Sequence, residues 1–154
     1  MKQVYDLLDN LKDRVRDNGI TNTVSYGDIS EVDLNKTTMF PLTHFILGDV
    51  TFSDNIITAD INILMADVVD ESKSKGDEDS FYGNTNLQDV MNTQLQVAND
   101  LQSHLRRGKL HDKNLRIVGD VTANPMQDKF ENELAGWSIT FSVQMPNTNF
   151  SICE

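Results

Sequence analysis

The sequence predicts an α+β fold in which two helices pack on one face of a mostly antiparallel sheet of four to five strands. Two segments repeat apolar residues every three or four positions, as amphipathic helices do, and other segments alternate apolar and polar residues, as half-buried strands do. The predicted order is helix, short strand, hairpin, helix and two strands, which suits a two-layer sandwich. A chain of 154 residues can bury a core of its own, so we expect one domain over residues 1–154.

The first helix is expected from Lys2 to Asp17, with charged residues on its outer side and Gly19 just beyond its end. Its apolar stripe consists of Val4, Leu7, Leu8, Leu11 and Val15. A short strand is predicted at Thr23–Tyr26. The polar stretch from Asp28 to Met39 is too long for a tight turn and indicates an arm or an excursion loop.

A hairpin is predicted from Thr43 to Val69, with its turn at Asp54-Asn55. A two-residue turn fixes which residues lie opposite each other across the two strands. The expected pairs on one apolar face are Phe52 with Ile57, Val50 with Ala59, Gly48 with Ile61, and Ile46 with Ile63.

The other face of this hairpin is unusual for a surface in water. It would place Asp49 opposite Asp60, and Phe45 opposite Leu64. Like charges that face each other destabilise a sheet, and an exposed apolar pair leaves hydrophobic area in water. Either water screens the aspartates while the chain's own loop covers the apolar pair, or a neighbouring subunit contacts this face and supplies a cation and a hydrophobic pocket. Phe45, Asp49, Asp60 and Leu64 are therefore the candidate subunit interface.

Residues 70–82 are highly charged and lack apolar periodicity, which predicts an exposed acidic loop. Its carboxylates are Asp70, Glu71, Asp77, Glu78 and Asp79. Three interpretations remain open: a solvated loop, a weak cation site, or a loop that projects into a channel or towards a partner. The EF-hand pattern is absent, because the required glycine and the final glutamate are not in place.

The second helix follows potential N-cap residues at 84–86 and ends before Gly108, after the cationic pair Arg106-Arg107. Its apolar stripe is Leu87, Val90, Met91, Gln94, Ala98, Leu101 and Leu105. Two strands are predicted after it, at Leu115–Ala123 and at Trp137–Met145, joined by a loop from Asn124 to Gly136.

The composition argues against several classes of function. The formal net charge is -11, which disfavours a protein that reads nucleic-acid sequence, although DNA could pass an acidic wall without binding. The candidate basic patch of Arg106, Arg107 and Lys109 is typical of a helix end. No stretch approaches the roughly 20 apolar residues of a membrane span, and no signal-peptide core is evident, so we expect a soluble protein.

No motif predicts catalysis, a cofactor or a metal site, and we expect the protein not to be an enzyme. His44, His104 and His111 lack metal-ligand spacing, and His44 is expected on the inward face of its strand as a satisfied histidine. The single cysteine, Cys153, excludes an intrachain disulfide and has no histidine nearby in sequence.

Two stretches carry a resemblance to known proteins. They are EVDLNKTTMFPLTHFILGDVTFSDN, at residues 31–55, and DKFENELAGWSITFSVQMPN, at residues 128–147. Together they resemble small structural proteins from the virion-gene cassettes of tailed bacteriophages, including marine and gut Bacteroidetes phages. The order of elements is similar to that of tail-completion or tail-terminator proteins.

The resemblance implies a subunit that forms a ring, with six copies expected, at the neck end of the tail tube. Its partners would be other copies of itself, the tail tube and the neck or connector proteins, and DNA would pass without specific binding. The protein would be made in the bacterial cytoplasm and reside in the virion. The alternatives are a head-tail connector or head-completion ring subunit, and a non-structural assembly adaptor.

Overall fold

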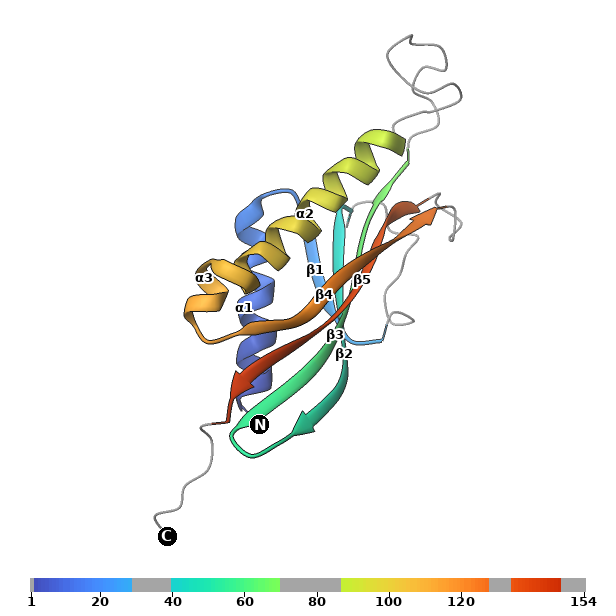
Figure 1. Ribbon diagram of the computed structural model, residues 1–154. Coiled ribbons are helices and arrows are strands. Elements are labelled where there is room, and N and C mark those ends of the chain that lie inside the picture. The colour runs from blue at the N-terminus through green and yellow to red at the C-terminus, as the bar shows by residue number, and fades with distance from the viewer. Residues whose placement is uncertain (1, 29–39, 70–86, 128–133, 148–154) are drawn as a thin grey trace, which may run out of the picture.

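The computed structural model describes residues 2–28, 40–69, 87–127 and 134–147, which form two layers, a sheet and a helical layer (Figure 1). The longer helices lie together on one side of the sheet (Figure 1). In chain order the elements are α1 (Lys2–Asn18), β1 (Thr23–Tyr26), β2 (Leu42–Phe52), β3 (Ile56–Val68), α2 (Leu87–Arg107), α3 (Lys109–Asp112), β4 (Arg116–Gln127) and β5 (Leu134–Pro146).

The five strands lie side by side in the order β1-β2-β3-β5-β4. β1 is parallel to β2, and the other three neighbouring pairs are antiparallel. The predicted α+β class, with a mostly antiparallel sheet and helices on one face, is therefore confirmed. β1 and β4 are the two edge strands, so the sheet is open at both sides.

The main core lies between the sheet and the helices, on what we call the covered face. Four residues of α1 contribute to it, spaced every three or four positions as predicted: Val4, Leu7, Leu11 and Val15. The sheet contributes alternate residues of β3 and β5, which include Ile57, Ala59, Ile61, Ile63, Ile139, Phe141 and Val143. Alternation in these strands puts every second side chain on the same side. The opposite side of the sheet carries none of the described helices, and we call it the uncovered face.

The hairpin register is partly as predicted and partly wrong. Phe52 lies opposite Ile57 and Val50 opposite Ala59, which confirms the pairs near the turn. The register then shifts by one residue, because Gly48 and Asp49 together face Asp60 in a β-bulge.

Beyond this bulge the predicted pairs of Gly48 with Ile61 and of Ile46 with Ile63 are wrong. Leu47 faces Ile61, and Phe45 faces Ile63. A one-residue shift turns every later side chain to the other face. Phe45 therefore packs in the core of the covered face, with 2% of its surface exposed.

The second half of the chain also departs from prediction at its strand ends. β4 extends to Gln127 and β5 begins at Leu134, so both ends of the predicted loop from Asn124 to Gly136 belong to strands. The alternation predicted for β5 from Trp137 to Met145 is confirmed. In β4 the predicted regular alternation is interrupted between Val118 and Thr122, where Gly119 has a φ of +72°. The short helix α3 was not predicted.

Gly136 lies where β5 approaches β3 closely. It pairs with Ala66 of β3. A Cβ atom at this position would lie 1.8 Å from the backbone oxygen of Met65, a distance that no side chain can occupy. Glycine is therefore required for β5 to approach β3 this closely.

Candidate assembly surface

The four residues of the predicted interface do not lie on one surface. Phe45 is buried under the helices, which corrects its predicted exposure next to Leu64. Leu64 faces His44 instead, on the uncovered face, and is half-buried. Asp49 is exposed at the bulge, and Asp60 lies opposite the bulge. Phe45 and Leu64 lie on opposite faces of the sheet because the bulge shifts the register by one residue.

The uncovered face satisfies its polar groups by hydrogen bonds across neighbouring strands. Ser142 Oγ donates to the Asp60 carboxylate, and Thr140 Oγ1 donates to the Asn62 side-chain oxygen. The hypothesis of a subunit interface on this face requires a cation from another subunit to compensate the negative charge of Asp60. The hydroxyl of Ser142 already supplies one partner within the chain, which weakens that requirement.

One end of the uncovered face is apolar. It forms a second, smaller cluster made of Phe40, Leu42, Ala66, Leu134 and the partly buried Val68. His44 lies next along β2 on the same face and is fully buried. The sequence placed His44 on the inward face with Ile46, and the bulge again accounts for the difference.

His44 is hydrogen-bonded at both ring nitrogens, which confirms that it is a satisfied histidine. Its Nε2 lies 2.8 Å from the backbone oxygen of Gly27, so Nε2 carries a proton and donates. In the neutral ring Nδ1 then accepts from the Ser25 hydroxyl, at 2.7 Å. These bonds join the end of β1 to β2 and hold the edge strand on the sheet.

Two polar groups face the helical layer under less favourable conditions. Gln94 of α2 is fully buried, and neither its nitrogen nor its oxygen has a hydrogen-bond partner among the described residues. Burial raises the pKa of Asp67, although a hydrogen bond from the Val68 backbone N–H acts in the opposite direction. Neither feature was predicted from the sequence, in which Gln94 occupies one position of the apolar stripe of the helix.

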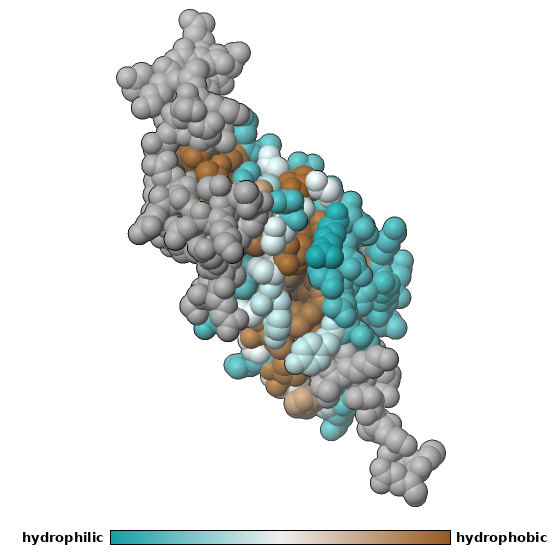
Figure 2. All heavy atoms as spheres, turned by 180° about the vertical axis from the view of Figure 1, so that it is seen from behind, coloured by the Kyte–Doolittle hydropathy of each residue, from teal (hydrophilic) through white to brown (hydrophobic). Residues whose placement is uncertain are grey.

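Large apolar side chains are exposed at both edges of the sheet and at the hairpin end. Tyr5 of α1 is 60% exposed and Tyr26 of the edge strand β1 is 52% exposed. The others are Phe52, Ile56, Leu95 and Val118. Seen from behind, hydrophobic residues form a band along the middle of the molecule, with hydrophilic residues along its right side (Figure 2).

A hollow of about 250 Å³ lies between α1 and β1, and both exposed tyrosines line it. Its floor is apolar and includes Leu8, Val24 and Phe45. Lys12 and Asp9 stand at its polar side and pair with each other at 3.4 Å. At the other edge of the sheet, a larger hollow of about 510 Å³ separates α2 from β4. Leu95, Ala98, Val121 and Ile139 line it, together with Arg106 and Asp120.

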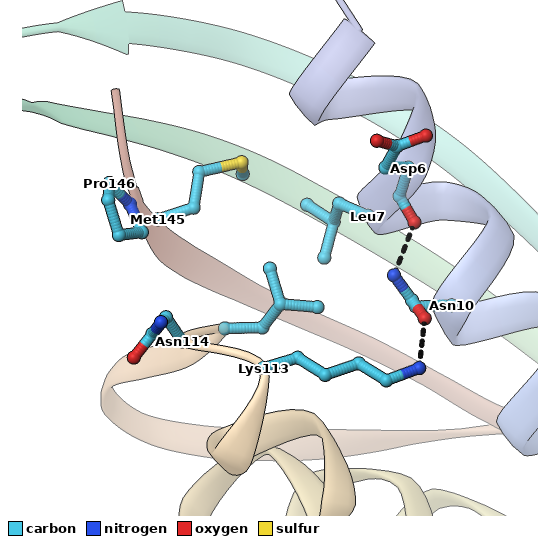
Figure 3. A pocket seen from close by; sticks show the side chains of 8 residues that line it. Asp6, Leu7, Asn10, Lys113, Asn114, Met145 and Pro146 are labelled. Atoms are coloured by element: carbon cyan, nitrogen blue, oxygen red, sulfur yellow. Dashed lines mark hydrogen bonds between the residues drawn. The ribbon is translucent and has the colours of Figure 1, made fainter. Parts of the chain in front are cut away.

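A third hollow, of about 280 Å³, lies where α1 meets the turn after α3 and the end of β5 (Figure 3). Lys113 reaches across it and donates to the Asn10 side-chain oxygen at 2.8 Å, and Asn10 donates to the backbone oxygen of Asp6 (Figure 3). Leu7 and Met145 form the apolar wall. These contacts tie α3 to α1, and we interpret the hollow as part of that junction.

The predicted acidic loop at residues 70–82, with Asp70, Glu71, Asp77, Glu78 and Asp79, lies outside the described residues. Within the described residues no group of three or more His, Cys, Asp or Glu side chains is placed to hold a metal ion. None of the described helices is both long enough and apolar enough to cross a membrane.

No protein-family model matches the chain, and no curated protein matches it. Two different surfaces stand out, an aromatic one beside β1 and a hollow one beside β4, at opposite edges of one sheet.

Proposed function

We propose that the protein is a structural subunit of a tailed-phage virion, a tail-terminator or tail-completion protein that forms a ring at the neck end of the tail tube. The observation that carries the proposal is the placement of two unlike surfaces at opposite edges of the sheet. Tyr5 and Tyr26 project beside β1, whereas the hollow lined by Leu95 lies beside β4.

Unlike surfaces on opposite sides of a subunit favour head-to-tail contacts. In such a heterologous contact, one surface of each copy binds a different surface of the next copy, and the chain of copies closes into a ring when the rotation allows it. Tyrosine side chains suit such contacts, because a large apolar ring ends in a hydroxyl that tolerates water. A stable contact buries about 800 Å² on each partner, which an edge strand and its adjacent helix can supply.

The placement of the ring in a phage virion rests on the resemblance of residues 31–55 and 128–147 to virion proteins. The acidic net charge of -11 supports it further, since DNA that leaves the head would pass such a ring without binding to it. Six copies, contact with the tail tube and neck proteins, and residence in the particle are all parts of the proposal.

Two variants test the head-to-tail contact. Tyr5→Asp with Tyr26→Asp should disable the β1 side, and Leu95→Asp should disable the β4 side. Each variant alone should be monomeric, because one contact surface is lost. A mixture of the two should form dimers and nothing larger, since only one intact contact can form between unlike variants. Gln96→Asp, also exposed on α2, is the matched control and should assemble as the wild type does.

The virion assignment needs a second experiment. Phage particles purified from an infected culture should contain this protein, and electron microscopy with a specific antibody should locate it at the neck end of the tail. Twelve-fold density at the head would favour a connector subunit, and absence from finished particles would favour an assembly adaptor. Either result would overturn the tail-terminator proposal.

A further inference from the structure

A cluster of cations lies at one corner of this acidic protein. Five of the 13 Lys and Arg residues fall between positions 106 and 116, against one carboxylate, Asp112. We call this group the basic corner: Arg106, Arg107, Lys109, Lys113 and Arg116, from the end of α2, α3, the turn after it and the start of β4. All five side chains are exposed.

The basic corner is not neutralised by the described part of the chain. Arg106 donates to Gln102 and to the backbone oxygen of Gly119, and Lys113 donates to Asn10, so all three partners are uncharged. The side chains of Arg107, Lys109 and Arg116 form no ion pair or hydrogen bond with the described residues. The salt bridges among described residues all lie elsewhere, on α1 and on Asp100.

A matching set of carboxylates runs along the outer side of α1. Asp6, Asp9, Asp13 and Asp17 recur at intervals of three or four residues, which places them on one face of the helix. This face points away from the core residues of α1, and all four side chains are exposed. Of the four, Asp9 alone has a cation partner among the described residues, Lys12.

We infer that the acidic face of α1 in one copy docks on the basic corner of the next copy. The inference rests on the proposed function, because it supplies the charged part of the same head-to-tail contact. α1 borders the hollow that holds Tyr5 and Tyr26. The basic corner includes Arg106, which lines the hollow beside β4. The two charged surfaces therefore flank the two apolar ones.

Charge complementarity of this kind selects the partner and its register, and it offsets the repulsion expected between subunits of net charge -11. Nucleic acid is the other polyanion that a basic corner could bind. The formal net charge of -11 disfavours that occupant, because a long polyanion would extend beyond the corner over acidic surface.

Two single substitutions with the same change in net charge separate this contact from general repulsion. Arg16 ends α1 and Arg107 ends α2, so both are exposed arginines in the last turn of a helix. Arg107→Glu should weaken self-association about tenfold, because it turns attraction into repulsion at the basic corner. Arg16→Glu adds a carboxylate beside the acidic face of α1 and should leave self-association unchanged or strengthen it. Both dissociation constants are measured by sedimentation velocity at low salt.

A charge exchange completes the test. Arg107→Glu with Lys109→Glu should dissociate the assembly, and so should Asp13→Lys with Asp17→Lys in a second preparation. Mixing the two preparations should restore the wild-type mass, with the variants alternating, because each reversed surface then meets a reversed partner. Circular dichroism should show both variants folded.

The outcomes distinguish the two proposals. If the wild-type chain associates but Arg107→Glu and Arg16→Glu behave alike, or if mixing restores nothing, the charged contact is wrong and the ring proposal stands. If the wild-type chain does not associate at all, both are wrong. If the protein binds DNA in a way that depends on Arg107 and does not self-associate, nucleic acid and not a second copy occupies the basic corner.

Discussion

The two faces of the sheet differ in whether their polar side chains have hydrogen-bond partners. On the uncovered face, polar side chains are paired: Ser25 with His44, Ser142 with Asp60, and Thr140 with Asn62. On the covered face the contacts are mostly aliphatic, and burial of polar groups is poorly compensated: Gln94 lacks a hydrogen-bond partner among the described residues, and Asp67 is partly desolvated.

This difference separates two contributions to the fold. The covered face supplies stability through burial of apolar area, which is strong but not directional. The uncovered face supplies directional hydrogen bonds, which contribute less net free energy but fix register and hold the edge strand. The surfaces proposed for assembly lie at the two edges of the sheet, beside β1 and β4.

The largest effect should come from truncating neighbouring residues that point to opposite faces. Ile63 is buried in the covered face, and Leu64, the next residue of β3, is half-buried on the uncovered face. Ile63→Ala should lower the free energy of unfolding by about 2–5 kcal/mol, and Leu64→Ala by about 1 kcal/mol or less. Urea denaturation measures both. Equal losses would contradict the assignment of the core to one side.

His44 offers a test of the paired groups on the uncovered face. His44→Ala should lower the free energy of unfolding by about 2–3 kcal/mol, because it removes two hydrogen bonds and leaves a cavity. Ser25→Ala removes one of these bonds and should lower it by about 1 kcal/mol. Hydrogen exchange should show faster opening of β1 in both variants. An unchanged rate in β1 would mean that the histidine does not hold the edge strand.

Replacing Gln94 should raise the free energy of unfolding, whereas the substitutions at His44 and Ser25 lower it. Gln94→Met keeps the length of the side chain and removes two buried polar atoms that lack described partners, so the protein should gain about 1 kcal/mol in the free energy of unfolding. Gln96→Met, two residues along at an exposed position, is the matched control and should change little. A loss of stability in the Gln94 variant would show that its amide is hydrogen-bonded after all.

The smallest effect concerns Asp67 and depends on pH. Its pKa is raised above the ordinary value of 3.8, so the folded state retains the proton to higher pH than the unfolded state does. The carboxyl therefore favours folding below pH 3.8, and this contribution is lost as the pH rises through the folded pKa. Asp67→Asn should be more stable than the wild type at pH 7 by a few tenths of a kcal/mol. The difference should shrink as the pH falls towards 3.8, and a constant difference would argue against a raised pKa.

The sequence was sufficient to predict an element and its buried side wherever the periodicity of apolar residues was unbroken. The stripe of α1, the stripe of α2 and the alternation of β5 each specified an element and its buried side. It was insufficient where one residue interrupts a strand, because a bulge leaves the composition unchanged but reverses the faces beyond it. Gly48 is the residue of this segment that could indicate the bulge, since a glycine inside a strand often marks one.

The same limitation affected the candidate surface. Phe45 was misplaced by the bulge, whereas Asp49, Asp60 and Leu64 remain predicted interface residues on the uncovered side. The aromatic pair of Tyr5 and Tyr26 was missed because its members come from separate elements that meet only in the fold. The spacing of residues within one segment cannot reveal a pair whose members come from two segments. The acidic face of α1 was present in the sequence, but its matching cations lie some 90 residues later.

Native mass spectrometry of the purified wild-type protein tests the central claim most directly, because that claim is association through the two edges of the sheet. One chain has a mass of 17.4 kDa, so a six-membered ring would have a mass of about 104 kDa. The account predicts a closed species near that mass at low salt, which dissociates as salt is raised. A single species at the mass of one chain, at every concentration up to the millimolar range, would contradict it.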